Sequence, residues 1–518
     1  MIDRFNVLFD HWIPLWINER RELVSLEDVL CGAVESSREI AHSRDELRVF
    51  AHGLVSALTQ ALFEPDSLST LKRRLAEPLS REEYRARATS VADDFELLGA
   101  PGWMQWGERT DEDLTADLLH ELSETYRPAL ARHVVAEGGL CAPCATVALY
   151  GFQAWAPAGG RGISPGVRGS PPLTTLVRGA NVRQTAWANV YVTRGGYERF
   201  AKDEARPWAL GPERRGKDGA SWEQYRKPAS EIGLVEGLFW KPRAVRLAPA
   251  SDGECAVCSL FAPRVRVSAF RAGAKKEDGY FAHPWTPSRV DKGERRTQHI
   301  ATDKPVWTGL ADMLSLVRPG SSKSEEAGGE DTLAAPTVTQ WSELRRPEGL
   351  SLLVFAYRFD NASLEGRFFQ SFPAIQRWAE RDFVDRVRCV VQYAEETLNA
   401  LLYALRRAYS DRQKSTASYF PQDARQQFWR ESEQLFWRYV RSLDVGEGVP
   451  EPIVPKLAAI ARRIFFALTE PAALEAKHQQ LVVRAQRGLN RALRTIIERE
   501  TPAVKSATTE ATATGAER

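Results

Sequence analysis

Four of the six cysteines in this 518-residue chain form two Cys-x-x-Cys pairs, and these are the side chains best suited to chemistry. The pairs are Cys141 with Cys144 and Cys255 with Cys258. Each pair places two soft thiolates a short turn apart, and tetrahedral zinc takes four such ligands. Because the pairs lie far apart in the sequence, one shared ion would clamp two distant segments together and leave no position open for catalysis. The sequence therefore predicts a single structural zinc.

Two alternatives stay open for these cysteines. The segment after Cys144 resembles the start of a helix, which suits a dithiol redox pair on a thioredoxin-like unit. On that interpretation the chain is a stand-alone zinc or dithiol oxidoreductase. The cysteines could also simply be packed in a core. The equal spacing of the second pair, and the polar turn at 251–254 before it, favour the shared zinc.

A glycine-rich segment at 156–169 is the second candidate site. Glycine lets a backbone approach another surface closely, and exposed amides together with Arg161 and Arg168 suit an anionic partner. The glycine spacing does not match a dinucleotide fingerprint, and no Gly-Lys-Ser/Thr follows to make a phosphate loop. A flexible turn is the alternative interpretation.

The third candidate is a basic stripe on the last long helix. Arginines recur there at steps of three and four, on a different face from a set of apolar residues. The stripe consists of Arg484, Arg487, Arg491 and Arg494, and the apolar face of Val482, Ala485, Leu489, Ala492 and Ile496. Arginine forks suit phosphate oxygens, so the stripe could follow a nucleic-acid backbone. A merely solvated face is the alternative.

The sequence shows no arrangement typical of catalysis. It contains no convincing Ser/His/Asp order, paired-carboxylate motif or His/carboxylate metal set, and His283 fits a structural or surface position better than a catalytic base. We therefore expect that the protein is not an enzyme.

Composition describes a globular chain without a membrane segment. Lys and Arg number 70 and Asp and Glu 68, so the net charge of +2 neither demands nor excludes nucleic acid. No apolar stretch reaches the length of about 18 residues that a membrane helix needs, and the start does not resemble a secretory signal. Few cysteines, arranged as metal knuckles, fit a reducing cytoplasm.

The pattern of apolar residues predicts an α+β fold with two domains. Helical spacing at 26–34 and 47–62 and short strand-like runs at 237–240, 265–267 and 352–355 indicate a mixed domain over 1–369. Within it, 319–335 is too polar to bury a core and is expected to be a mobile insertion. Amphipathic helices at about 383–405, 422–443, 452–469 and 471–499 predict a four-helix bundle over 370–500. The Thr/Ala-rich end, 501–518, is expected to be disordered.

The order of several segments resembles the CasA family, the large subunit of the type I-E CRISPR surveillance complex Cascade. The resemblance runs from Phe5 to about residue 500. It is carried by the two cysteine pairs, the glycine-rich segment and these motifs: FNVL at 5–8, WIP at 12–14, VSLEDVL at 24–30, PGWMQ at 101–105, QAWAP at 153–157, VRGSPPLTTLVRG at 167–179, GLFWKP at 237–242 and HPWTP at 283–287.

The resemblance implies a mixed α+β N-terminal domain of unusual topology, a C-terminal four-helix bundle and a role without catalysis. Such a subunit works with the other Cascade subunits and the guide RNA. It inspects double-stranded DNA for the short motif that flanks a target (the PAM), helps to start strand separation and recruits a helicase-nuclease. In such complexes protein reads the short motif and base pairing reads the long sequence.

The family's motif-reading elements fall on three segments of this chain. The glycine loop corresponds to Ala158, Gly159, Gly160 and Arg161, with Gly162 next; the lysine finger corresponds to Lys275 or Lys276; and the glutamine wedge corresponds to Asn361. A further family loop beside the guide corresponds to about 128–140, which contains His133. The zinc would join the start of the glycine-loop segment to the start of the lysine-finger hairpin and so fix the spacing of two readers.

Overall fold

The chain divides into two compact units, 1–302 with 315–374 and 303–314 with 375–518. The computed structural model describes residues 4–98, 102–105, 139–155, 158, 163–169, 172–194, 196–217, 222–299, 304–316, 331–360, 363–410, 420–446, 451–469 and 476–514. The sequence predicted one boundary near 370. The structure also assigns 303–314 to the second unit, because Trp307 stacks on Phe436 of that unit with ring centroids 4.4 Å apart.

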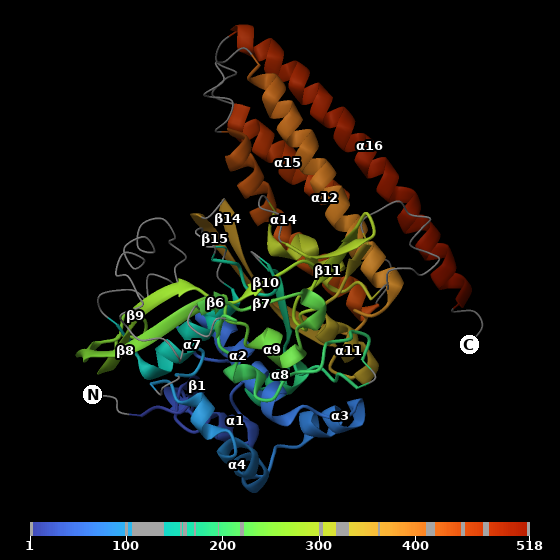
Figure 1. Ribbon diagram of the computed structural model, residues 1–518. Helices are drawn as coiled ribbons and strands as arrows, with labels where there is room; N and C mark the ends of the chain where they lie inside the picture. Colours follow the sequence, from blue (N-terminus) through green and yellow to red (C-terminus); the bar gives the residue numbers. More distant parts are fainter. Residues whose placement is uncertain are drawn as a thin grey trace. The chain divides into compact units, whose positions relative to one another are not determined.

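The first unit contains one long, buried helix and several shorter helices. These helices are α1 (Leu26–Leu30), α2 (Asp45–Phe63), α3 (Leu68–Ala76), α4 (Arg81–Thr89), α7 (Ala142–Ala154), α8 (Val182–Ala188), α9 (Leu234–Leu238) and α11 (Pro336–Leu344). Helix α2 is buried along nearly its whole length and contacts α7, α8 and α9 (Figure 1). Glycine permits the approach of α7, because a Cβ on Gly151 would lie 2.3 Å from the ring of Phe50.

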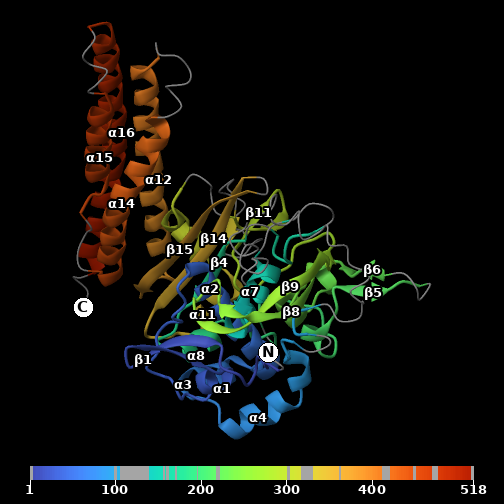
Figure 2. The ribbon, with the colours of Figure 1, turned by 90° about the vertical axis from the view of Figure 1, so that its left-hand side faces the viewer.

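The strands of this unit form small separate sheets among the described residues. Their bounds are β1 (Ile13–Ile17), β2 (Arg20–Val24), β3 (Leu140–Cys141), β4 (Thr174–Val177), β5 (Glu213–Arg215), β6 (Trp222–Gln224), β7 (Arg226–Lys227), β8 (Arg243–Glu254), β9 (Phe261–Ala272), β10 (Lys275–Lys276), β11 (Ser288–Asp291), β12 (Glu294–Thr297), β13 (Asp331–Leu333), β14 (Leu350–Asp360) and β15 (Ser363–Ile375). The two-stranded sheets are β1-β2, β10-β7 and β5-β6, and the three-stranded sheets are β12-β11-β13, β15-β14-β4 and β3-β9-β8. The long β8-β9 hairpin lies beside α7 (Figures 1 and 2).

Two local predictions in this unit need correction. The apolar run at 237–240 is not a strand, because Leu234–Leu238 form α9, whose first turn is capped by Asp203: its carboxylate accepts from Val235 N and Glu236 N. The end of the predicted insertion 319–335 is a strand, because β13 pairs with β11 and buries Leu333. The rest of that insertion, up to residue 330, lies outside the described residues.

The second unit contains the predicted four-helix bundle. Its helices are α10 (Leu310–Met313), α12 (Arg381–Ala408), α14 (Phe420–Val445), α15 (Val454–Thr469) and α16 (Ala476–Thr514), and α12 contacts each of the other three long helices (Figure 2). The apolar residues expected on α12 are all buried: Phe383, Val387, Val390, Ala394, Leu398, Leu401 and Leu405. The mixed α+β fold with C-terminal helices is thus confirmed.

The predicted disordered tail over 501–518 differs from the structure. Helix α16 continues to Thr514, and only 515–518 lie outside the described residues. Alanine, the strongest helix former, recurs through this end and supports continuation of the helix. In the described part of the chain, no helix has the length and apolar character needed to cross a membrane.

Candidate metal centre and nucleic-acid-reading segments

The two cysteine pairs meet where β3 joins the β8-β9 hairpin. Cys141 ends β3 and precedes α7, and Cys144 lies in the first turn of that helix. Cys255 and Cys258 lie in the turn between β8 and β9. The pairs converge because β3 pairs with β9, with Leu140 opposite Val265. The predicted convergence of the two pairs is confirmed.

The geometry of the four sulfurs suits one tetrahedral ion. All four Sγ atoms lie within 4.8 Å of one another, and those of Cys141 and Cys258 are 3.7 Å apart. Zn–S bonds of about 2.3 Å in a tetrahedron place the sulfurs about 3.8 Å apart. Three of the cysteines are buried, and Cys258 is half-buried. The cluster could therefore bind a metal.

The four thiols differ in how readily they lose a proton. Hydrogen bonds within the cluster lower the pKa of Cys255 and Cys258, because the thiols of Cys141 and Cys144 donate to them, and raise the pKa of Cys141 and Cys144. The thiolate is the form of cysteine that binds metals. Cys255 and Cys258 are thus the two sulfurs that lose a proton most readily. The convergence of four thiols argues against a lone dithiol redox pair, although Cys144 does lie at the start of a helix, as that alternative expected.

Backbone bonds hold the two pairs in place. Cys255 N donates to Leu260 O at 2.9 Å and Ser259 N donates to Cys255 O at 2.9 Å, which closes the second turn. Ser259 adopts a φ of +59°, a left-handed conformation that this tight turn requires. Ala256 N donates to Gly139 O at 3.2 Å and so ties the two cysteine turns together.

The far end of α7 is also attached to the hairpin. The side-chain amide of Gln153 donates to Arg243 O at 2.9 Å and accepts from Arg243 N at 3.2 Å. Arg243 begins β8 at the end of the hairpin opposite the cysteines. Helix α7 is therefore joined to the hairpin at both ends, by the cysteine cluster and by Gln153. Gln153 lies in the QAWAP motif, but nothing local in the sequence indicates its bonds to Arg243.

The glycine-loop positions lie just beyond this helix. Ala158 is exposed, whereas Gly159, Gly160, Arg161 and Gly162 lie outside the described residues. The expectation that Arg168 offers its charge to an anionic partner is wrong, because its side chain is only 2% exposed. It is buried against the ring of Trp155, 4.4 Å from the ring centroid. His283 is also buried, as expected for a structural residue.

The two candidate lysines form β10, which pairs in parallel with β7. Lys276 Nζ donates to Gly279 O at 2.7 Å, and burial lowers the pKa of this ammonium group. For the Lys275 ammonium no hydrogen bond or ion pair is found within the described part of the chain. The lysines follow the end of β9 that is farthest from the cysteines, roughly 36 Å along the strand. The metal centre thus joins the start of α7 to the turn of the β8-β9 hairpin. The glycine-loop positions follow the other end of α7, and the two candidate lysines follow the other end of β9.

The remaining family positions fall largely outside the described residues. Asn361 belongs to the link between β14, which ends at Asp360, and β15, which begins at Ser363. Neither Asn361 nor His133, in the segment 128–138, is described.

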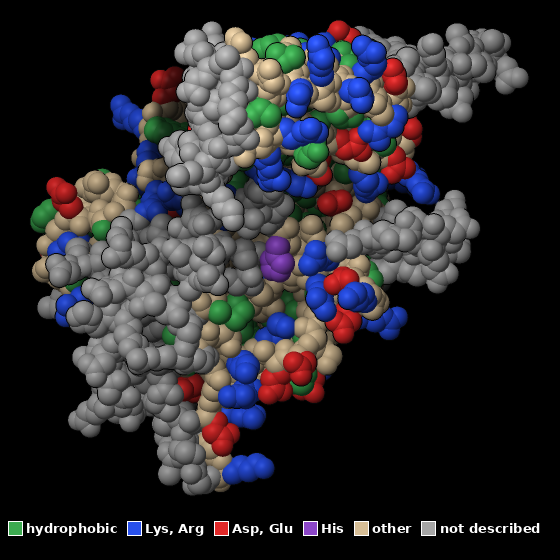
Figure 3. All heavy atoms as spheres, turned by 90° about the horizontal axis from the view of Figure 1, so that it is seen from above, with side chains coloured by type: hydrophobic (Ala, Val, Ile, Leu, Met, Phe, Trp, Pro, Cys, Tyr) green, Lys and Arg blue, Asp and Glu red, His purple; other side chains and the backbone are tan. Residues whose placement is uncertain are grey.

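All four arginines of the basic stripe are exposed on α16. None of their guanidinium groups forms an ion pair or a hydrogen bond with another described residue. Of the predicted apolar face, Val482, Ala485, Leu489 and Ile496 are buried, but Leu493 is buried in place of Ala492, which is half-buried. The step from Leu489 to Leu493 is four residues, as the period of 3.6 residues per turn allows. Lys and Arg side chains gather over the bundle helices in Figure 3.

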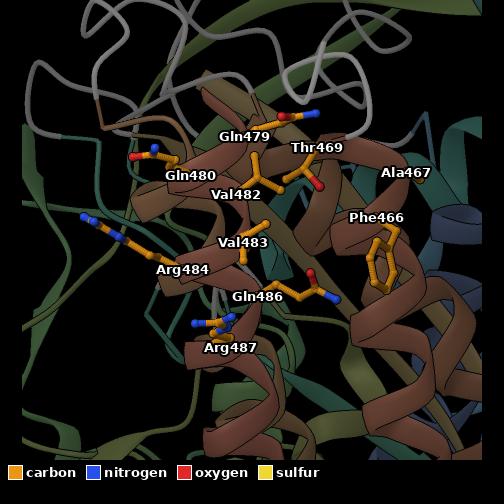
Figure 4. Close-up of a pocket in the computed structure, with 10 residues that line it drawn as sticks. All are labelled: Phe466, Ala467, Thr469, Gln479, Gln480, Val482, Val483, Arg484, Gln486 and Arg487. Atoms are coloured by element: carbon orange, nitrogen blue, oxygen red, sulfur yellow. The ribbon is translucent and has the colours of Figure 1, made fainter. Parts of the chain in front are cut away.

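A groove of about 1030 Å³ adjoins the start of this stripe, between the end of α15 and the start of α16. Figure 4 shows the Phe466 ring on α15 opposite Val483 and Gln486 of α16, while Arg484 points away from Phe466. Phe466 is 50% exposed and Val483 is 44% exposed. The stripe is therefore an accessible basic surface, with apolar side chains at one end.

Comparison with known proteins finds one family model and several solved structures that match most of the chain. Residues 6–469 match the family model of the CRISPR-associated protein Cse1. The structure is similar to CasA (Cse1) of Thermus thermophilus, with a TM-score of 0.71 and 17% identity over 95% of this chain and 99% of that chain. It is similar to Cse1 of Acidimicrobium ferrooxidans, with a TM-score of 0.67 and 17% identity over 96% of this chain and 99% of that chain. A chain of a CRISPR RNA-guided surveillance complex gives a TM-score of 0.66 and 15% identity, covering 94% of this chain and 99% of that chain.

Proposed function

The chain belongs to the CRISPR-associated Cse1 (CasA) family, and we propose on that premise that it is a non-catalytic subunit of an RNA-guided CRISPR surveillance complex of the Cascade type. A similar fold in a chain of such a complex supports this assignment. Within the complex, the subunit reads the PAM in double-stranded DNA and helps to start strand separation. Its partners are the other Cascade subunits, the guide RNA, the target duplex and a helicase-nuclease that it recruits.

The observation that carries the DNA-reading role is the double attachment of α7 to the β8-β9 hairpin. Helix α7 leads directly to the glycine-loop positions that begin at Ala158, and the hairpin leads to Lys275. The cysteine cluster joins these elements at one end, and Gln153 joins them at the other. Two loops mounted on one stiff support keep a fixed spacing, which readout of a short motif requires.

We assign one structural zinc ion to the four cysteines. Four thiolates form a closed, soft site typical of structural zinc, and such a site leaves no position for a substrate. Its contribution is to stabilise the junction of β3, α7 and the hairpin. The four-sulfur arrangement also gives no support to a stand-alone oxidoreductase.

Binding of target duplexes by the guide-loaded complex, with and without this chain, tests the proposed function. The duplexes carry a library of flanking motifs, and the affinity for each is measured at one salt concentration. We expect that both tight binding and motif preference require this chain. Equal binding and equal preference in its absence would contradict the DNA-reading role.

Lys275 is the better candidate for the lysine finger. Its ammonium group has no hydrogen bond or ion pair with any described residue, whereas that of Lys276 donates to Gly279 O. We expect Lys275→Ala to weaken binding to preferred motifs by about tenfold, the usual effect of losing one base contact. Lys276→Ala serves as the matched control and should lower the thermal stability while changing motif preference little. The reverse pattern in the same binding assay would assign the finger to Lys276.

The arginine stripe is proposed to contact the DNA backbone. Replacing Arg487 and Arg491 by glutamine should weaken binding equally for all flanking motifs and reduce the slope of log K against log salt by about 2. Arg388→Gln is a suitable control, because this exposed arginine on α12 is already paired with Asp385 at 2.9 Å. A loss that depends on the motif, or an unchanged salt slope, would contradict backbone contact by the stripe.

A further inference from the structure

Arg168 is a buried cation without a carboxylate partner among the described residues. Its guanidinium donates to Thr174 Oγ1 at 2.8 Å, to Thr286 Oγ1 at 3.4 Å and to Ala154 O at 3.1 Å. It also lies over the ring of Trp155. Burial lowers the pKa of Arg168 to about 9, so it remains charged at neutral pH. Neutral acceptors and one aromatic face therefore hold a full positive charge.

Such an arrangement is costly, because burying a charge without an ionic partner has a large desolvation penalty. An apolar side chain of similar volume would fill the same space without that penalty. It could not, however, make three directed hydrogen bonds to three different segments. The contacts of Arg168 thus fix the relative positions of three segments and add little to the stability of the core.

Two of the segments that Arg168 joins lie at the two ends of the 156–167 stretch of the glycine-rich segment. Ala154 and Trp155 end α7, immediately before residue 156, and Arg168 follows residue 167. The glycine-loop positions lie between these two points of the chain. The side chain of Arg168, which follows them, therefore contacts Ala154 and Trp155, which precede them. Trp155 Nε1 donates at 2.9 Å to the same Thr174 Oγ1 that accepts from Arg168. Since Thr174 begins β4, both ends are anchored to that strand.

Glycines make the close approach possible. A Cβ on Gly166 would lie 2.9 Å from Ala154 O and 3.3 Å from Gln153 O, so only glycine lets the two backbones approach this closely. Gly169 N donates to Gly166 O at 2.9 Å, and Gly169 has a φ of +81°. This turn places Arg168 between the two glycines.

We propose that Arg168 is a positioning residue, which ties the two described ends of the glycine-rich segment together, and that motif reading by the complex depends on this tie. The second half of this statement rests on the proposed function. The first half rests on the contacts of the described residues alone. Arg168 itself touches no DNA, since it is buried.

Two variants and one matched control test the proposal. Arg168→Met keeps the volume and loses the hydrogen bonds, and Arg168→Lys keeps the charge and loses the fork. Arg183→Met is the control, because Arg183 is 3% exposed but bonds Glu35 at 2.7 Å, on α8, away from this segment. Hydrogen exchange of the 156–167 amides is measured in the full-length chain, and flanking-motif preference is measured in the complex.

We expect Arg168→Met to speed exchange at 156–167 by about tenfold or more and to narrow the ratio of affinities for preferred and other motifs by about tenfold. Arg168→Lys should show the same changes to a smaller degree, and it replaces the methionine variant if that protein does not fold. Arg183→Met should lower thermal stability and leave both readouts unchanged. If Arg168→Met and Arg183→Met differ in neither readout, Arg168 is merely structural and the proposal is overturned. If exchange rises but the wild-type complex shows no motif preference, the positioning role stands and the proposed function fails.

Discussion

Replacing Cys255 by serine is expected to reduce the zinc content of the purified chain from about one ion to nearly none. Cys255 is 2% exposed, and its sulfur lies within 4.8 Å of the other three. A serine hydroxyl is a poor replacement for a thiolate, so the site would keep only three strong ligands. Because metal binding at such a site contributes folding free energy, the free energy of unfolding should fall by about 3–5 kcal/mol. Metal analysis and denaturant titration measure the two effects.

Cys389→Ser is the matched control for this prediction. Cys389 is an exposed cysteine on α12, far in sequence from both pairs, so its replacement should leave zinc content and stability unchanged. The Cys255→Ser complex should also discriminate less between flanking motifs, since the metal would no longer join α7 to the hairpin and weaker contacts, such as those of Gln153 and the strand pairing of β3, would remain. Unchanged zinc content in the Cys255→Ser protein would refute the four-cysteine site.

The cysteine cluster was predictable because the prediction depends only on residue type and spacing. Two pairs of equal spacing favour one shared ion whatever the fold between them, and the structure brings the four sulfurs together. The bundle was predictable for a different reason. The apolar spacing in α12 is a local property of the helix, and residues such as Val387 and Leu401 are buried as this spacing requires.

Burial of Arg168 was not predictable, because it depends on residues that the sequence does not place. A charged side chain among glycines suggests an exposed loop, and nothing local shows that Trp155, Thr174 and Thr286 surround it. The two-way bond between Gln153 and Arg243 was missed for the same reason. The choice between the two lysines also needed the structure, since only the turn at Gly279 distinguishes Lys276 from Lys275.

Replacing Glu236 by glutamine is expected to destabilise β7, the strand that pairs with the two candidate lysines of β10. Glu236 is 2% exposed and accepts from Lys227 Nζ at 2.7 Å, from Tyr225 Oη at 3.0 Å and from Gly233 N at 3.3 Å. Burial alone would lower the pKa of Lys227, but its hydrogen bond to Glu236 and the charge of that carboxylate raise the pKa above its ordinary value. Without Glu236 the ammonium group would lose its buried anion. Breaking one partner of such a pair costs about 3 kcal/mol.

Loss of the Glu236 carboxylate should also weaken motif reading by the candidate lysines, because Lys227 lies in β7 directly opposite Lys276 of β10. We therefore expect Glu236→Gln to reduce both the free energy of unfolding and the motif preference of the complex. Glu204→Gln is a closely matched control, since Glu204 contacts the same ammonium group at 3.4 Å but its side chain is 56% exposed. Loss of an exposed pair costs about 0.5 kcal/mol or less, so this variant should bind like the wild type. Equal losses of stability in the two variants would show that the buried carboxylate is not what holds β7 in place. A stability loss confined to Glu236→Gln, with motif preference intact, would show instead that β7 does not position β10.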